Sequence, residues 1–183
     1  KLIPIPGSTR ALSASATGPA QVQFSPDGDL LVVTEKSTSL IDVFPVGPNG
    51  LPGTRVTTAS HGLTPFGFAF GKRNQLFVAE AFGVAPNASA ISSYVAHDNG
   101  SLTLVTGSAP THQSAACWVV VNNGGRLTYA TDTGSASITG FRIDSGGDLT
   151  ILNASGRTGV TPPGSSPIDE ALSNDGRFLY ALT

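Results

Sequence analysis

The segment from Val22 to Glu35 reads VQFSPDGDLLVVTE, and its pattern decides the fold. A short apolar stretch is followed by Ser25-Pro26-Asp27-Gly28 and then by a run rich in Leu and Val. Proline presets φ and glycine tolerates a positive φ, so the four-residue segment is typical of a tight turn. The two flanking runs are therefore predicted to pair as antiparallel strands.

Three further segments repeat this pattern: FAFGKRNQLFVAEA at 68–81, VVVNNGGRLTYATD at 119–132 and EALSNDGRFLYALT at 170–183. Aligned without gaps, the four copies place Phe24, Phe70, Val121 and Leu172 at one position, at intervals of 46, 51 and 51 residues. A repeat of this length indicates stacked units that bury one continuous core between them. We expect the four anchor residues to occupy equivalent buried sites.

A second block follows in three of the copies: IDVFPVGPNGLPG at 41–53, ISSYVAHDNGSLT at 91–103 and ITGFRIDSGGDLT at 138–150. Each reads as a strand, a glycine-containing turn and the start of another strand. No segment keeps a period of 3.6 residues, so almost no helix is expected. Four short antiparallel strands in about 40–50 residues are typical of one blade of a β-propeller.

The predicted fold is all-β, a partial propeller of three complete blades plus parts of two more. Residues 1–18 are expected to form the outer strand of a preceding blade, beginning at Leu2, because LIPIPGSTR matches the fourth-strand segments of later copies. Blades follow at 19–64, 65–115 and 116–166, and 167–183 supplies the first two strands of another. Open blade faces and strand edges favour association. The expected partners are the remaining blades of the same propeller or a second copy of the chain.

Composition narrows the functional classes. The chain has 183 residues, a net charge of −2 and only 12% charged residues, so no basic surface for nucleic acid is expected. The longest apolar run, Ala115 to Val121, is too short to span a membrane. The single Cys117 cannot form an internal disulfide. Low charge and abundant Ser, Thr and Gly favour a secreted or periplasmic protein, with a cytoplasmic location left open.

The chain resembles the bacterial lactonase-like seven-bladed propellers, which include propeller-type 6-phosphogluconolactonase and proteins described as 3-carboxymuconate cyclases. The resemblance is carried by GPAQVQFSPDGDLLVVTEK, TPFGFAFG, AACWVVV, DTGSASITGFRI and SPIDEALSNDGRFLYAL. It covers essentially the whole chain and is specific for the fold. It implies a propeller of nearly twice this length, of which this chain is a middle part.

The resemblance implies hydrolysis of a small sugar-acid or aromatic-acid lactone, with a ligand at the mouth of the central channel. Members often place Pro-His at the start of the inner strand, where the imidazole enters the channel. The equivalent residues here are Ala20, Phe66, Cys117 and Ile168, so no copy keeps the histidine. The alternative is therefore a non-catalytic propeller that serves as an extracellular binding or structural module. Whether the chain is an enzyme stays open.

Four residues are candidate catalytic groups. Glu35, Glu80 and Asp132 begin the loops after the second strands, on the channel rim, where carboxylates could position water. Such carboxylates more often cap loop backbone. His112 lies in the loop that enters the third blade, and His61 holds the equivalent place one blade earlier. Both could act as bases or ligands, although loop histidines are more often simply solvated.

Two further residues have alternative interpretations. Glu170 replaces the apolar residues Val22, Phe68 and Val119, so burial between blades would raise its pKa and suit a general acid, unless it pairs with an arginine. Cys117 is interpreted as a core residue. Any ligand is expected near Glu35, Glu80, His112 and Asp132 rather than at the Asp27-Gly28 and Asp175-Gly176 turns. The sequence predicts no metal ligands and identifies no cofactor.

Overall fold

The computed structural model describes residues 3–183 as a series of antiparallel sheets that follow one another along the chain. The first sheet contains β1 (Pro19–Phe24), β2 (Leu30–Glu35), β3 (Leu40–Pro45) and β4 (Val56–Ala59). The second contains β5 (Pro65–Phe70), β6 (Gln75–Glu80), β7 (Ala90–Ala96) and β8 (Leu102–Pro110). The third contains β9 (Ala116–Val121), β10 (Leu127–Asp132), β11 (Ser137–Ile143) and β12 (Leu149–Ile151), with β13 (Gly159–Val160) also paired to β11. The hairpin of β14 (Asp169–Leu172) and β15 (Leu179–Leu182) ends the chain.

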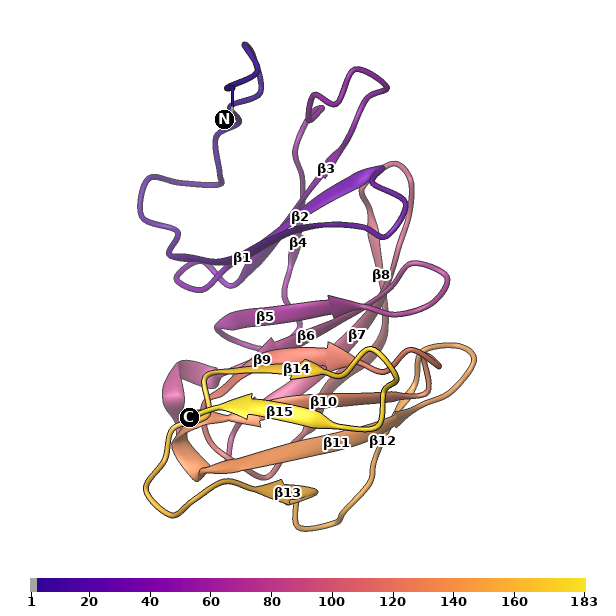
Figure 1. The fold of residues 1–183 in the computed structure, drawn as a ribbon. Helices are drawn as coiled ribbons and strands as arrows, with labels where there is room; N and C mark the ends of the chain where they lie inside the picture. Colours follow the sequence, from indigo (N-terminus) through magenta and orange to yellow (C-terminus); the bar gives the residue numbers. More distant parts are fainter. Residues whose placement is uncertain (1–2) are drawn as a thin grey trace.

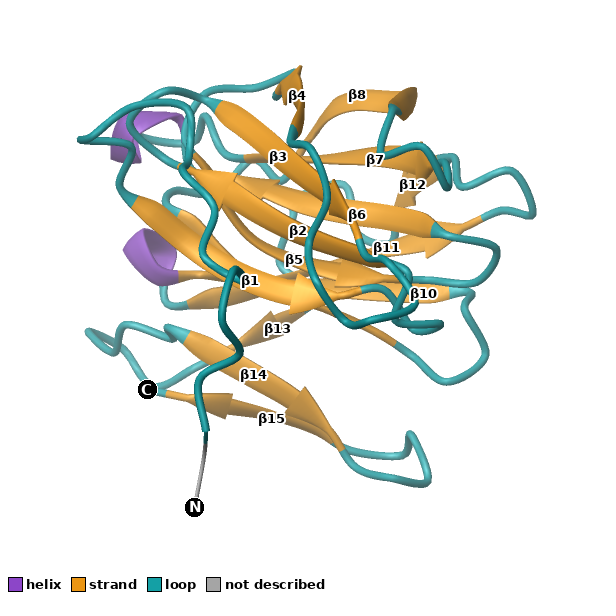
Figure 2. Cartoon of the chain, turned by 90° about the horizontal axis from the view of Figure 1, so that it is seen from above, coloured by secondary structure: helices purple, strands orange, loops and turns teal. Residues whose placement is uncertain are grey.

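These sheets are propeller blades, as the repeat predicted. Each of the first two has its strands in sequence order, and the inner strands β1, β5, β9 and β14 lie side by side (Figures 1 and 2). The helical content of the described residues is limited to two short 3₁₀ turns, Phe82–Val84 and Thr133–Ser135. The all-β partial propeller is confirmed.

The turn between the first two strands differs in one copy. In the first copy, the Ser25 amide closes the hairpin by donating to the Leu30 carbonyl, five residues on. In the second copy, Gly71 reaches Gln75, only four residues on, through the left-handed pair Arg73 and Asn74. The gapless alignment was therefore wrong by one residue at β6. A shorter two-residue turn replaces the longer turn that contains a left-handed glycine.

Two apolar clusters, each between neighbouring blades, form the core. Between the first and second blades, Phe68 packs with Leu30 and Val32. Between the second and third, Val119 packs with Phe77 and Ala79. Side chains alternate between the two faces of each strand, so one face of a blade meets the preceding blade and the other meets the next. Burial therefore depends on stacking.

The expectation for the anchor residues was wrong. Phe24 is 52% exposed, and Phe70, Val121 and Leu172 are only partly buried. The enclosed residue lies two positions earlier, where Phe68 is 1% exposed. The anchors sit at the end of the inner strand, beside the turn, where the neighbouring blade covers them less.

The outer strand expected before the first blade stays a prediction. The structure describes no strand in residues 3–18, and the predicted start of that strand at Leu2 lies outside the described residues. An outer strand forms only when a neighbouring strand supplies hydrogen bonds along its length, and residues 3–18 have none in this chain. Ser13 and Arg10 tether this segment instead, through bonds to the Glu35 carboxylate and the Gly53 carbonyl.

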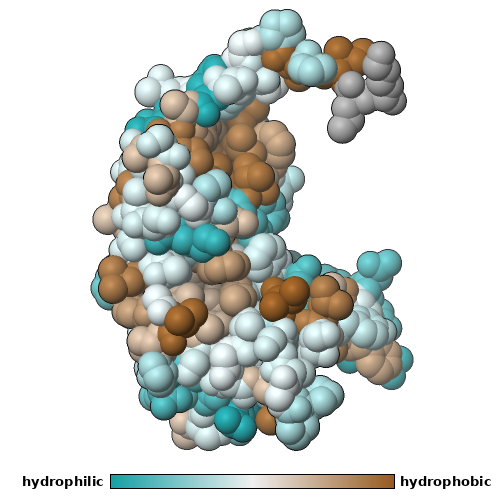
Figure 3. All heavy atoms as spheres, turned by 90° about the vertical axis from the view of Figure 1, so that its left-hand side faces the viewer, coloured by the Kyte–Doolittle hydropathy of each residue, from teal (hydrophilic) through white to brown (hydrophobic). Residues whose placement is uncertain are grey.

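The stacked blades form an open, crescent-shaped body, and hydrophobic side chains gather along its hollowed side (Figure 3). The apolar residues of the first blade's outward face belong to this exposed set, with Val22 62% exposed. On the opposite end, Phe178, Tyr180 and Leu182 of the final hairpin are also exposed. These are the positions that adjacent blades cover elsewhere in the chain.

We predict that Phe68→Ala lowers the free energy of unfolding by about 3–5 kcal/mol, because it opens a cavity between two blades. Phe24→Ala, the matched control on the open face, is expected to change it by less than about 1 kcal/mol. Urea unfolding followed by circular dichroism measures both. Equal losses would contradict the stacking of blades described above.

Candidate functional site

The ends of the second strands bring three predicted carboxylates to one rim. Glu35, Glu80 and Asp132 are the last residues of β2, β6 and β10. Each pairs with the start of the inner strand of its own blade: Pro19↔Glu35, Pro65↔Glu80 and Ala116↔Asp132. They therefore occupy equivalent places in three successive blades. All three side chains are fully buried.

Glu80 is held by the loops and strands around it. Its Oε1 accepts hydrogen bonds from the Gly62 amide at 2.8 Å and from the Ser92 hydroxyl at 2.5 Å. Its Oε2 accepts from the Ser108 hydroxyl at 2.7 Å. Both oxygens are engaged, so this carboxylate fixes the loop that enters the second blade. In this arrangement it has no free oxygen to offer a substrate.

Glu35 has the same kind of role in the first blade. The Ser13 amide donates to Oε1 at 2.9 Å, and the Thr38 hydroxyl donates to Oε2 at 2.5 Å. Burial opposes its ionisation, but hydrogen bonds from Ser13 and Thr38 outweigh that effect and hold the pKa of Glu35 below its ordinary value. The carboxylate is therefore ionised and committed to the backbone.

A second carboxyl lies beside Glu35. Asp42 on β3 occupies the position of Ser92 and Thr139 in the other blades, whose hydroxyls donate to the rim carboxylates. Burial raises the pKa of Asp42, and Glu35 raises it further. Arg55 offsets part of this, with 3.5 Å between its Nε and Oδ2 of Asp42. A protonated Asp42 can donate to Glu35 as the hydroxyls do elsewhere.

Asp132 differs from the other rim carboxylates. The Thr139 hydroxyl donates to its Oδ2 at 2.7 Å, whereas Oδ1 has no hydrogen-bond partner within the described residues. Burial raises the pKa of Asp132 to about 7. This side chain therefore holds a proton over part of the neutral range. Its free oxygen is sealed from solvent.

The two histidines occupy equivalent loops but different environments. His61 Nδ1 lies 2.9 Å from the Ser108 hydroxyl, which itself donates to Glu80. His112 is exposed, with a left-handed backbone at φ 58°. Of the four predicted catalytic residues, His112 is the one whose side chain reaches solvent on the rim.

The channel mouth holds a cluster that sequence reasoning did not identify. Lys36 follows β2, and its Nζ lies 4.8 Å from the centre of the Phe66 ring. Phe66 in turn makes an edge-to-face contact with Trp118, with ring centres 5.9 Å apart. All three side chains are partly exposed, and Lys36 forms no ion pair within residues 3–183. Their proximity arises from three different blades, so no local sequence pattern could have shown it.

Local backbone geometry supports this cluster. A Cβ on Gly67 would lie 2.5 Å from the Cys117 carbonyl oxygen and 3.2 Å from the Trp118 ring, so only glycine allows the two inner strands to approach. Gln21 joins the next pair of inner strands. Its amide accepts from the Phe68 N–H at 2.8 Å and donates to the Phe68 carbonyl at 2.9 Å. Strand β5 is therefore in close contact with β9 at Gly67 and hydrogen-bonded to β1 through Gln21.

A cavity of about 360 Å³ opens along the inner strands. Gln21, Gln23 and Trp118 contribute to its wall, together with residues of β5, β9 and β14.

Cys117, interpreted above as a core residue, is half-buried beside Trp118, and burial raises the pKa of its thiol. The thiol is therefore poorly suited to act as a nucleophile.

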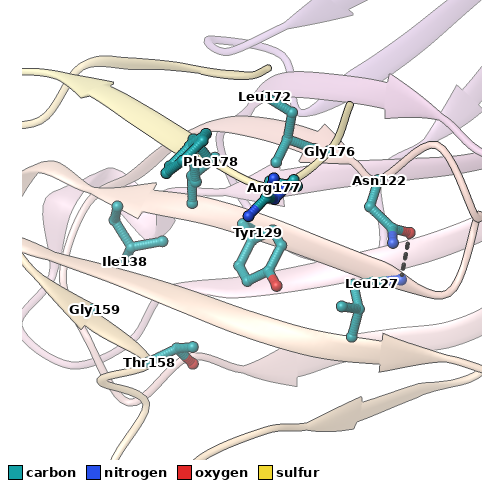
Figure 4. A pocket seen from close by; sticks show the side chains of 11 residues that line it. Asn122, Leu127, Tyr129, Ile138, Thr158, Gly159, Leu172, Gly176, Arg177 and Phe178 are labelled. Carbon is teal, nitrogen blue, oxygen red and sulfur yellow. Dashed lines mark hydrogen bonds between the residues drawn. The ribbon is translucent and has the colours of Figure 1, made fainter. Parts of the chain in front are cut away.

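A separate groove of about 220 Å³ runs between the third blade and β15 (Figure 4). Tyr129 and Ile138 line one side, and Leu172 and Phe178 line the other. In the first blade the positions equivalent to Tyr129 and Ile138 are Val32 and Ile41, which are buried in the core against the second blade. The groove is thus lined by positions that pack between blades. It does not include Lys36, Phe66 or Trp118 of the channel mouth.

Among residues 3–183, no group of three or more His, Cys, Asp or Glu side chains is arranged to hold a metal ion. No helix in the same range is long and apolar enough to cross a membrane.

Comparison with known proteins gives a fold. No protein-family model matches the chain, and no curated protein matches it. Solved structures do. The periplasmic gluconolactonase of Pseudomonas aeruginosa matches with a TM-score of 0.67 at 22% identity, over 89% of this chain and 50% of that one. A gluconolactonase of Xanthomonas campestris matches with a TM-score of 0.60 at 17% identity, over 97% and 57%.

The likeness also reaches beyond lactonases, because hydrazine synthase of Kuenenia stuttgartiensis matches with a TM-score of 0.64 at 16% identity, over 97% of this chain and 44% of that one. The chain spans about half the length of the solved structures that it matches. At these identities the likeness concerns the fold. Several of the other matched structures are described as gluconolactonases or 6-phosphogluconolactonases, and the chain has the fold of these lactonase-like propellers.

Proposed function

We propose that the channel mouth binds a small sugar-acid or aromatic-acid lactone and that the protein hydrolyses it. The observation that carries this proposal is the cluster of Lys36, Phe66 and Trp118: an ammonium without an ion pair among residues 3–183 lies over the Phe66 ring, which contacts Trp118. Aromatic faces and edges pack against the C–H groups of a sugar or aromatic ring. The ammonium can pair with a carboxylate or phosphate, or polarise the lactone carbonyl.

The reaction needs a base as well as a binding site. Water adds to the lactone carbonyl, the base takes its proton, and cleavage of the ring C–O bond releases an alkoxide that is then protonated. His112 is the proposed base, because its side chain is exposed on the rim while Glu35 and Glu80 are occupied by loop hydrogen bonds. Asp132 is sealed, so we no longer assign it a direct contact with substrate.

A non-catalytic binding module is the second candidate. Two observations favour it. The carboxylates of Glu35 and Glu80 accept hydrogen bonds from neighbouring side chains, and no histidine stands at the starts of β1, β5 and β9. In that case the same cluster would bind a ligand without turnover. Calorimetric binding and lactone hydrolysis, measured on the same preparation, separate the two functions.

We predict that Lys36→Met lowers kcat/KM for glucono-lactone hydrolysis about tenfold or more, the effect of losing one charge-assisted hydrogen bond. Lys72→Met is the matched control, because Lys72 lies in the β5–β6 turn at the other end of the blade. It should leave hydrolysis unchanged. Acid release above the spontaneous rate is the readout. Equal effects of the two substitutions would remove the proposed role of Lys36.

His112→Ala is expected to lower kcat by about 100-fold with little change in KM, because a general base acts on the chemical step. The same acid-release assay measures it, with His97→Ala as the control at a turn remote from the rim. Binding of the lactone with no turnover in the unmodified protein would instead establish the non-catalytic function.

Glu80→Gln is predicted to act through stability. The amide keeps one acceptor but faces donors at both oxygens, so the free energy of unfolding should fall by about 1–3 kcal/mol. Chemical denaturation measures the loss, and the folded fraction should retain kcat within a factor of about three. A folded variant with no turnover would show that Glu80 has a catalytic role.

A further inference from the structure

Two buried carboxyl groups meet at the junction between the third blade and the final hairpin. Asp132 ends β10, and Glu170 lies on β14. Oδ1 of Asp132 and both carboxyl oxygens of Glu170 are sealed from solvent and have no hydrogen-bond partner within the described residues. Buried polar groups in folded proteins are nearly always hydrogen-bonded, so three free oxygens at one junction require an explanation.

The position of Glu170 makes the arrangement unusual. The same site holds Phe68 and Val119 in the second and third blades, where apolar side chains pack on the preceding blade. Glu170 is 6% exposed in that place. A buried carboxylate without a partner is strongly disfavoured, and two of them repel each other. The neutral, protonated form is the one that this site can accommodate.

The charged and titratable groups around the pair do not compensate it. Asp132 interacts electrostatically with Cys117 on β9 and with Arg157 in the loop between β12 and β13, and Glu170 interacts with its neighbour Asp169 on β14. Arg157 favours ionisation of Asp132 but forms no ion pair with it. Burial, then the charge of Asp132, then that of Asp169 raise the pKa of Glu170.

We propose that Asp132 and Glu170 form a proton-binding pair that joins the β14–β15 hairpin to the third blade, and that this joint loosens when the pair loses its protons. The carboxyl oxygens are sealed, so the pair acts on packing and does not meet substrate in this arrangement. The proposal holds whether or not the protein hydrolyses a lactone.

The direction of the pH effect follows from linkage. Both groups have a higher pKa in the docked state than in an exposed one, so the docked state binds more protons. Docking is therefore strongest below the ordinary carboxyl pKa of 3.8 and weakens as the pH rises toward about 7, where Asp132 ionises. Glu170, whose pKa is also raised by burial, adds to the loss of docking as the pH rises. For each group that is protonated in the docked state and ionised in the exposed state, the equilibrium constant for docking falls about tenfold per pH unit.

Hydrogen exchange of the full chain tests the proposal. Peptides covering 169–182 are followed by mass spectrometry from pH 5 to pH 9, with rates corrected for intrinsic exchange, and a peptide covering β6 is the internal control. The protection of 169–182 is expected to fall by about tenfold or more across this range, while that of β6 stays constant. Equal behaviour of the two peptides would overturn the proposal.

Three substitutions assign the effect to the pair. Glu170→Val restores the residue type of the other blades and should reduce the pH dependence of the protection of 169–182, leaving only the part that Asp132 contributes. Glu170→Gln, which cannot ionise and keeps the shape of the side chain, should do the same if the valine variant folds poorly. Asp132→Asn should reduce the pH dependence. A fall with pH that persists unchanged in both Glu170 variants would show that other groups control the joint.

Discussion

The contact between an inner strand and the preceding blade is the constraint on which the structure depends. Phe68 against Leu30 and Val32 joins the first two blades, and Val119 against Phe77 and Ala79 joins the next two. A single four-stranded sheet has two apolar faces and cannot bury either alone. Stacking buries one face against each neighbour, and the apolar position of Phe68 recurs as Val22 and Val119 but is Glu170 in the fourth copy.

This stacking also determines what the rim can do chemically. It brings Glu35, Glu80 and Asp132 to equivalent places but encloses all three, so two become anchors for loops and the third keeps a proton. It leaves Lys36 and Trp118 at the mouth of the channel. Glu35 and Glu80, which the sequence marks as reactive, are thus structural, and the proposed ligand site consists of residues that look ordinary in the sequence.

The hairpins and turns could be predicted from the sequence, because residues close together in the chain determine them. The hairpins, the turns around residues 25–28 and 122–125 and the near absence of helix follow from turn residues and strand alternation. The one-residue shortening before β6 was missed, because Arg73 and Asn74 form a left-handed turn without glycine. The outer strand expected before Pro19 stays a prediction, because such a strand forms only beside a partner strand and none is described for residues 3–18.

The candidate site was less predictable, since it depends on contacts between blades. Phe66 and Trp118 lie on different inner strands, and their proximity requires the close approach at Gly67. Glu170 did carry a signal, because a carboxylate replaced apolar residues at one repeat position. The sequence could not show that no cation within the described residues pairs with it, and this absence of a partner distinguishes the junction from the other blade contacts.

We expect a small ligand to bind at the channel mouth beside Trp118, and the fluorescence of this residue measures such binding directly. The chain contains a single tryptophan, so its fluorescence reports on that place alone. Titration with gluconate, the hydrolysis product, avoids turnover during the measurement. We predict a saturable change in the intensity or emission maximum of Trp118 that is abolished by Lys36→Met and kept in Lys72→Met. Calorimetric binding of gluconate without any change in this fluorescence would place the ligand elsewhere and contradict the account.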